Sequence, residues 1–459
     1  MAARTRARLS LQSYGEGVDR FSASYLEALY RQLAGLDETM GLPAIYAEHA
    51  SLFETSAIDA LRGLADGQDD EAAQARLFLE FAVTEHLSAQ VAELTDRIET
   101  AEAQAVIIWR GERIPYRAAW NRAADISGRA ERNGLADSYH EAVEAINPLR
   151  EERLEKRAEA VRGLGYRDVT DMVQQTAGFD PQQLAAELRA FLVDSETVYF
   201  AALRRNLAEI DIEQGDASQV DLAHVLRGAG WDAWFDARGM VPALRRTLAT
   251  LGIDMEAQGN ITLDVEARPR KSPRAFCAPV SVPDDIRLVI QPRGGWDDYA
   301  ALLHEAGHAQ HFSHVSADLP AAFRRLGDNS LTEGYGVLFE RLVGDPGWLM
   351  DHTGMAEADA LAFADFNAFW YLRLVRATAA QFMYELVLHS GVEPAVAREQ
   401  YVGMRSLTEG VTFAPAGYLQ LDDDLYSARY ARATMLEGSL SAWLRHRHGE
   451  SWWRSAEAG

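Results

Sequence analysis

Hydrophobic residues recur at three- and four-residue intervals through most of this chain, which is the spacing of amphipathic helices. The stretch Asp70–Trp109 follows that spacing without a proline or glycine. Further along, Asp180 and Pro181 form a capping and first-turn signal at the start of another helical stretch. The pattern therefore predicts a chain that is mainly α-helical.

One region departs from this pattern. Just after residue 259, three short runs rich in β-branched residues are separated by prolines and charges, and they predict a small sheet: Ile261–Val265, Phe276–Val282 and Asp285–Gln291. The helical pattern then resumes. We expect an N-terminal helical region over residues 1–259 and a second region over residues 260–459, packed together as one body around a cleft.

Charge and composition narrow the class of protein. The chain has 459 residues with 69 acidic and 45 basic side chains, for a net charge of −24, which argues against a nucleic-acid partner. The single cysteine, Cys277, excludes a disulfide framework and suits a reducing compartment. The sequence contains no apolar run of about 18 residues, so we predict no membrane span. The basic N-terminus lacks the apolar core of a secretory signal, so we expect a cytoplasmic location.

A metal-binding motif follows the predicted sheet. The helical stretch there contains His304, Glu305 and His308 in an H-E-x-x-H arrangement. Residues four apart on a helix differ by about 40° around its axis, so both imidazoles can reach one metal ion. Neutral imidazoles suit Zn²⁺, and Glu305 between them can accept a proton from a water molecule. The alternative is a pair of partly buried histidines with no metal.

A third ligand has to come from another element. The next predicted helix, capped by Asn329 or Ser330, carries Glu333 in its first turns, 25 residues after His308. Its apolar flanks indicate a buried helix, and a buried carboxylate needs a partner such as a metal. Glu340 lies seven residues later, about 20° from the same face, and could contact a ligand from behind.

The motif and its surroundings resemble the gluzincin peptidases of the thimet oligopeptidase and oligoendopeptidase F family. Five positions match the H-E-x-G-H-x-x-H pattern of that family: His304, Glu305, Gly307, His308 and His311. The Asp-Leu-Pro segment before Glu333 is also similar to angiotensin-converting enzyme. The resemblance covers roughly residues 260–440.

This resemblance implies a two-lobed helical metallopeptidase with a deep cleft. It also implies one Zn²⁺ per chain, held by His304, His308 and Glu333, with Glu305 as general base and His311 near the ligands. In the family, the strand before the zinc-binding helix is a sheet edge that lies beside the substrate.

The same families use a tyrosine from a late helical segment to stabilise the oxyanion that forms on the scissile carbonyl. Tyr426 and Tyr430 lie four residues apart here, and Arg429-Tyr430 resembles the Arg-Tyr pair of the angiotensin-converting enzyme group. We favour Tyr430 as the donor, with Tyr426 as the second candidate. Both tyrosines could instead be amphipathic residues at a helix edge.

The leading hypothesis is therefore a zinc metallopeptidase that hydrolyses short peptides. A carboxypeptidase or dipeptidase of the same clan is one alternative, and it would need a fixed charge for a peptide terminus. Arg324 and Arg325 could bind such a carboxylate, or could merely cap a loop. A helical binding protein without catalysis is the other alternative. The sequence indicates no oligomeric state.

Overall fold

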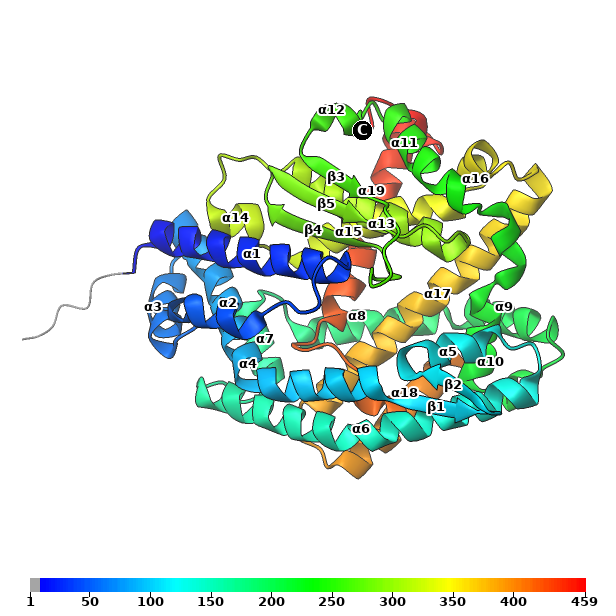
Figure 1. Ribbon diagram of the computed structural model, residues 1–459, viewed down its shortest axis with the longest axis horizontal. Coiled ribbons are helices and arrows are strands. Elements are labelled where there is room, and N and C mark those ends of the chain that lie inside the picture. The colour runs from blue at the N-terminus through cyan, green and yellow to red at the C-terminus, as the bar shows by residue number, and fades with distance from the viewer. Residues whose placement is uncertain (1–8) are drawn as a thin grey trace, which may run out of the picture. The chain divides into compact units, whose positions relative to one another are not determined.

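The computed structural model describes residues 9–459, and it is mainly helical, as predicted (Figure 1). The first eight residues, which begin the basic N-terminal segment, lie outside the described part. Within the described residues, no helix combines the length and the apolar character needed to cross a membrane.

Two compact units make up the chain, and each is assembled from separate segments. Unit 1 contains the described residues up to His86 together with Trp231–Ala364 and Arg432–Gly459. Unit 2 contains Leu87–Gly230 and Asp365–Ala431. This division differs from the predicted boundary at residue 259, because both units draw on segments from either side of it.

One reason for the difference is that three of the four crossings between the units fall inside long helices: α4 (Asp70–Gln104), α17 (Glu357–Leu388) and α19 (Ser427–His448). The fourth crossing, between Gly230 and Trp231, falls in the short 3-10 segment Ala229–Trp234. An uninterrupted helix leaves no proline, glycine or compositional shift at the crossing point. A boundary of that kind leaves no mark in the pattern of the sequence.

The remaining helices belong to one unit each. Those of unit 1 are α1 (Leu11–Leu33), α2 (Leu42–Glu48), α3 (Thr55–Ala65), α11 (Met240–Thr250), α12 (Met255–Gln258), α13 (Trp296–Ser313), α14 (Ala321–Arg325), α15 (Asn329–Glu340) and α16 (Pro346–Thr353). Those of unit 2 are α5 (Tyr116–Asp125), α6 (Arg129–Gly163), α7 (Val169–Thr176), α8 (Pro181–Asp194), α9 (Glu196–Ala208), α10 (Gln219–Arg227) and α18 (Pro394–Glu409). The side chain of Asp180 caps α8 by accepting from two backbone N–H groups, as predicted.

The predicted three-stranded sheet is present in unit 1. Its strands are β3 (Ile261–Asp264), β4 (Phe276–Ser281) and β5 (Asp285–Val289), in the spatial order β3-β5-β4. β5 pairs in parallel with β3 and antiparallel with β4, so β4 forms one edge. Helix α13 packs against β4 and β5, and α1 packs against β4 (Figure 1). The sheet thus supports the helix that carries the H-E-x-x-H motif.

A second, two-stranded sheet was not predicted. The helix expected over Asp70–Trp109 ends at Gln104, and β1 (Val106–Trp109) pairs with β2 (Glu112–Pro115) in an antiparallel hairpin. The connecting residues Arg110 and Gly111 both have positive φ, as a tight hairpin turn requires. The run Val106-Ile107-Ile108 before an Arg-Gly pair was the available signal, because β-branched residues favour strands.

Candidate metal centre

The H-E-x-x-H motif lies in the middle of α13 in unit 1. Its apolar residues are buried, among them Leu302, Leu303 and Ala306, and they fix the rotation of the helix. This rotation turns the imidazoles of His304 and His308 toward each other, with their Nε2 atoms 3.1 Å apart. The two imidazoles are therefore directed at the same place, as predicted.

Helix α15 supplies the carboxylate. The side chain of Asp328 caps this helix by accepting from the backbone N–H of Ser330, so the cap is one residue earlier than the predicted Asn329 or Ser330. Glu333 is buried, and its Oε2 lies 3.5 Å from Nε2 of His304 and 3.7 Å from Nε2 of His308. Among the described residues, His304, His308 and Glu333 are the group whose ligand atoms gather within 4.8 Å of one another.

Two glycines allow the helices to cross this closely. A Cβ atom on Gly307 would lie 2.3 Å from the backbone oxygen of Tyr335 on α15. A Cβ atom on Gly336 would lie 2.9 Å from the ring of His304. Real Cβ contacts are never that short, so any larger residue would push α13 and α15 apart. The absence of side chains at both positions is what lets Glu333 reach the imidazoles.

The other ring nitrogens are held by neighbours on α15. Nδ1 of His304 lies 2.9 Å from Oε2 of Glu340, and Nδ1 of His308 lies 2.8 Å from the hydroxyl of Thr332. With both Nδ1 atoms occupied, each ring presents Nε2 to Glu333. This is how metal-binding histidines are usually oriented. Glu340 was anticipated at this place, whereas Thr332 was not, because a threonine beside a glutamate carries no distinguishing pattern.

Glu305 lies on α13 between the two histidines and is held against the edge strand β4. The backbone N–H of Cys277 on β4 donates a hydrogen bond to its carboxylate. Burial is the largest influence on this group, and it raises the pKa of Glu305 to about 7. A carboxylate with such a pKa can both accept and release a proton near neutrality.

The electrostatic balance of the cluster calls for a positive charge. Burial alone would lower the pKa of His304, but its hydrogen bonds with Glu333 and Glu340 outweigh burial and raise the pKa to about 10. Burial, and then the charge of His304, lower the pKa of His308 to about 4. Three carboxylates around two partly buried imidazoles thus favour one cationic group among them.

A zinc ion fits this donor set. Two imidazole nitrogens and one carboxylate oxygen converge, which is the three-ligand set of catalytic zinc sites. Both imidazoles carry hydrogen-bond partners on their outer nitrogens, and the carboxylate is buried. The residues that could hold the metal are therefore His304, His308 and Glu333.

His311, the third histidine of the motif, has different surroundings. Its ring stacks in parallel on Tyr335, with centroids 5.2 Å apart. Burial lowers its pKa, and its Nδ1 has no hydrogen-bond partner within the described residues. The residue lies one turn beyond His308, and the stacking links α13 to α15.

The arginine pair Arg324-Arg325 is engaged by the protein itself. Both guanidinium groups bind Asp19 of α1, at 2.6 and 3.0 Å. Arg325 also donates to the backbone oxygens of Pro279 and Val280 on β4. Of the two sequence-based interpretations, the capping role matches these contacts, because the pair joins α1 to the end of the edge strand.

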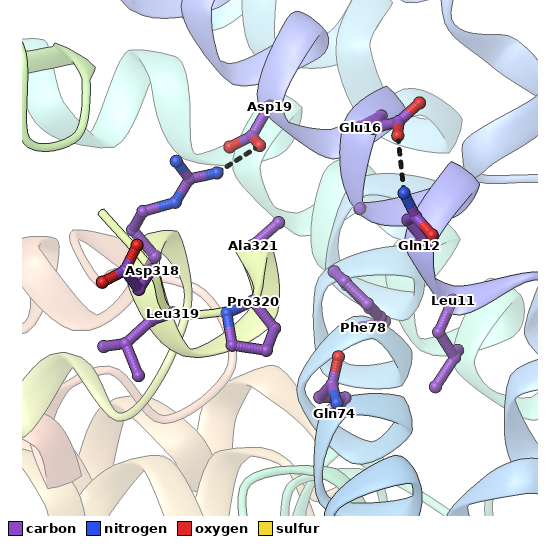
Figure 2. A pocket seen from close by; sticks show the side chains of 12 residues that line it. Leu11, Gln12, Glu16, Asp19, Gln74, Phe78, Asp318, Leu319, Pro320 and Ala321 are labelled. Carbon is purple, nitrogen blue, oxygen red and sulfur yellow. Dashed lines mark hydrogen bonds and ion pairs between the residues drawn. The ribbon is translucent and has the colours of Figure 1, made fainter. Parts of the chain in front are cut away.

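The cavity beside this arginine pair is separate from the metal ligands. It has a volume of about 360 Å³ and lies between α1, α4 and the segment that leads into α14 (Figure 2). Leu11, Phe78 and Leu319 contribute apolar surface, while Glu16 and Asp318 contribute carboxylates. None of the His304, His308 or Glu333 side chains lines it.

The candidate tyrosines belong to unit 2. Tyr426 lies in the turn before α19, and Tyr430 lies in the first turns of that helix. Their rings meet edge to face with centroids 5.1 Å apart, and the guanidinium of Arg429 covers the ring of Tyr426. Their role as oxyanion donors stays a prediction.

The fold and the cluster together define a two-unit helical protein with a His-His-Glu centre on an H-E-x-x-H helix. Its fold is that of two solved peptidase structures. One is a protein provisionally named oligoendopeptidase F, with a TM-score of 0.70 and 15% identity, over 97% of this chain and 84% of the other. The second is PZ peptidase A with an inhibitor, with a TM-score of 0.65 and 13% identity, over 97% of this chain and 89% of the other.

The likeness is one of structure. No protein-family model matches the sequence, and no curated protein matches it either. At this level of identity the comparisons establish the fold, which agrees with the predicted mainly helical architecture. The chemistry has to be argued from the site itself.

The crossing at Gly307 provides a test of the geometry. We expect Gly307→Ala to lower the free energy of unfolding by about 1–3 kcal/mol, because the added methyl group overpacks the contact with α15. Zinc retention should fall with it, since Glu333 is displaced from the imidazoles. Chemical denaturation and metal analysis measure the two effects.

Gly438→Ala is the matched control. Gly438 is an exposed glycine inside α19, and a Cβ atom there would meet nothing within 4 Å. Alanine is favoured over glycine in a helix by about 0.8–1.0 kcal/mol, so this variant should be as stable as the wild type or more so. Equal stability and zinc content in both variants would contradict the role of the glycine contact.

Proposed function

We propose that this chain is a zinc-dependent peptidase that hydrolyses short peptides in the cytoplasm. The observation that carries the proposal is the convergence of His304, His308 and Glu333, with the Glu305 carboxylate held beside them against an edge strand. The likeness to two peptidase structures supports it at the level of the fold.

The zinc ion would be held by His304, His308 and Glu333, one ion per chain. When bound, zinc acts as a Lewis acid and lowers the pKa of water toward neutrality. Glu340 and Thr332 keep the two imidazoles in the orientation that presents Nε2. His311 supports the same pair of helices through its stacking on Tyr335.

Glu305 is the proposed general base. Its carboxylate accepts the proton of the attacking water and passes it to the amine that leaves, so the proton is conserved through the reaction. The hydrogen bond from the backbone N–H of Cys277 fixes the direction of the carboxylate. Burial, which favours the neutral form, makes the carboxylate a stronger base, so that it takes up the proton of water near neutral pH and holds it until the amine leaves.

The edge strand β4 supports a peptide as the substrate. β4 pairs with β5 on one side only, and Glu305 faces it at Cys277. An extended peptide can add to a sheet edge through backbone hydrogen bonds, which depend little on its sequence. Such a peptide would lie with a backbone amide beside the proposed base.

The endopeptidase and exopeptidase alternatives differ in whether the protein needs a fixed charge to bind a peptide terminus. A carboxypeptidase needs a fixed cation for the terminal carboxylate, and both Arg324 and Arg325 are already paired with Asp19. This observation favours cleavage within a peptide over removal of its last residue. The same arginine contacts give no support to a dipeptidase.

The metal assignment is tested by removing one ligand. We expect His308→Ala to lose near-stoichiometric zinc, because two ligands hold the ion much less tightly than three. His314→Ala is the control, since His314 lies at the exposed end of α13 and bonds to Gln310 and Gln258. Metal analysis of both purified variants gives the answer, and equal zinc content would remove the assignment.

The reaction is tested with the Glu305→Gln variant. We expect it to keep its zinc but to lose activity by about a hundredfold or more, because the amide cannot accept the proton of water. Digestion of a peptide library, with and without a chelator, followed by mass spectrometry measures this and reports the cleavage positions. Wild-type turnover in Glu305→Gln would disprove the mechanism, and zinc-loaded wild type without any cleavage would disprove the function.

The proposed oxyanion donor is tested with two tyrosine variants. We expect Tyr430→Phe to lower kcat with little change in KM, because the hydroxyl acts only in the transition state. Loss of one such donor typically costs about 2.7–4 kcal/mol of transition-state stabilisation. The comparison is Tyr430→Phe against Tyr426→Phe on one peptide at one pH. A loss confined to Tyr426→Phe would exchange the two roles, and full kcat in both would assign the donor elsewhere.

A further inference from the structure

The segment that leads into α19 has an unfavourable backbone conformation in unit 2. Asp424 and Leu425, two consecutive residues other than glycine, have φ values of +57° and +54°. L-residues avoid this left-handed region because Cβ approaches the following carbonyl oxygen. Two in succession persist only where the surroundings hold them, and such strain is common at functional sites. Tyr426 follows directly.

Two arginines of α6 hold this segment through consecutive carboxylates. Arg153 donates from both terminal nitrogens to the two oxygens of Asp423, at 2.9 and 2.6 Å. Arg157 donates to both oxygens of Asp424 at 2.7 Å. The arginines are four residues apart and therefore lie on one face of α6. Arg157 is 2% exposed, so its pairing is shielded from solvent.

The Arg153 side chain and the turn that it binds are themselves held by further contacts. Nε of Arg153 donates to the hydroxyl of Thr95 at 2.8 Å, so its guanidinium plane is held from both ends. Leu425 is buried, which ties the strained turn to the core of unit 2. On the far side, the hydroxyl of Ser427 donates to the fully buried carboxylate of Glu385. These contacts therefore restrain the turn that carries Tyr426.

We propose that Arg153 and Arg157 are positioning residues, which hold Asp423 and Asp424 so that Tyr426 and Tyr430 keep the direction needed for catalysis. The inference rests on the proposed function, because it assigns a purpose to the two tyrosines. An ordinary structural ion pair would need only opposite charges. The two parallel hydrogen bonds of Arg153 and the strained backbone beyond them indicate that orientation is what these contacts provide.

Lysine in place of arginine separates charge from orientation. A lysine ammonium keeps the positive charge but cannot form the two parallel hydrogen bonds of a guanidinium. We expect Arg153→Lys to keep its melting temperature and zinc content and to lower kcat by about 10- to 100-fold with KM little changed, because small misplacements of a catalytic group cost rate. Arg205→Lys is the control, since Arg205 makes an exposed ion pair with Asp365 in the same unit. The Arg205→Lys variant should match the wild type in kcat, melting temperature and zinc content.

A double-mutant cycle shows whether the arginine acts through a tyrosine. If it does, Arg153→Lys should lower kcat less than about twofold further once the responsible hydroxyl is gone, as in Tyr430→Phe or Tyr426→Phe, because contacts in one network are not additive. Fully additive losses with both tyrosine variants would overturn the proposal. So would an unchanged kcat in Arg153→Lys.

Amide hydrogen exchange tests the same inference without using activity. We expect Arg153→Lys to exchange faster than the wild type over residues 422–430, with unchanged exchange over α13 and α15. If the zinc-loaded wild type cleaves no peptide, the proposed function fails whatever the exchange shows. If it cleaves peptides but exchange over residues 422–430 is unchanged in the variant, the positioning role alone fails.

Discussion

The close crossing of α13 and α15 is the constraint on which the metal centre depends. Gly307 and Gly336 remove the side chains that would separate the helices, so a carboxylate from one reaches two imidazoles of the other. The result is a cluster of buried acidic groups around a small space. Such a cluster is costly unless a positive charge sits in it, because burial penalises unpaired carboxylates. The helix packing that brings these carboxylates together therefore also makes the binding of a cation favourable.

Hydrogen bonds from neighbouring residues fix the orientation of each group in the cluster. Glu340 and Thr332 occupy the outer nitrogens of the two imidazoles, and the edge strand β4 holds Glu305 through a backbone N–H. β4 in turn is tied to α1 by Arg325, which binds both Asp19 and two backbone oxygens of the strand. These contacts fix the orientation of each group, which is what favours catalysis by fixed charges and dipoles.

The candidate residues are found in both compact units of the chain. The metal ligands and the proposed general base belong to unit 1, whereas the candidate tyrosines belong to unit 2, beside a strained turn held by α6. Three of the four crossings of the chain between the units fall inside α4, α17 and α19. Tyr430 lies two residues before the first unit 1 residue of α19, Arg432.

The sequence by itself determined the helical class, the three-stranded sheet and the H-E-x-x-H helix, because these depend on periodicity and on spacing along a single element. It also pointed to Glu333 and Glu340, since both fall on one face of one helix. It did not indicate the hairpin at Val106–Pro115, where a β-branched run was hidden at the end of a helical pattern.

Only the tertiary structure decided how elements meet. The role of Gly307 and Gly336 appears when two helices are placed in contact, and the contact of Thr332 with His308 follows from that crossing. The division into units was not predicted either, because three of its four crossings lie inside unbroken helices. The same holds for Arg153 and Arg157, whose partners lie about 270 residues away in the chain. Periodicity describes a single element, whereas contacts between distant segments arise only from packing.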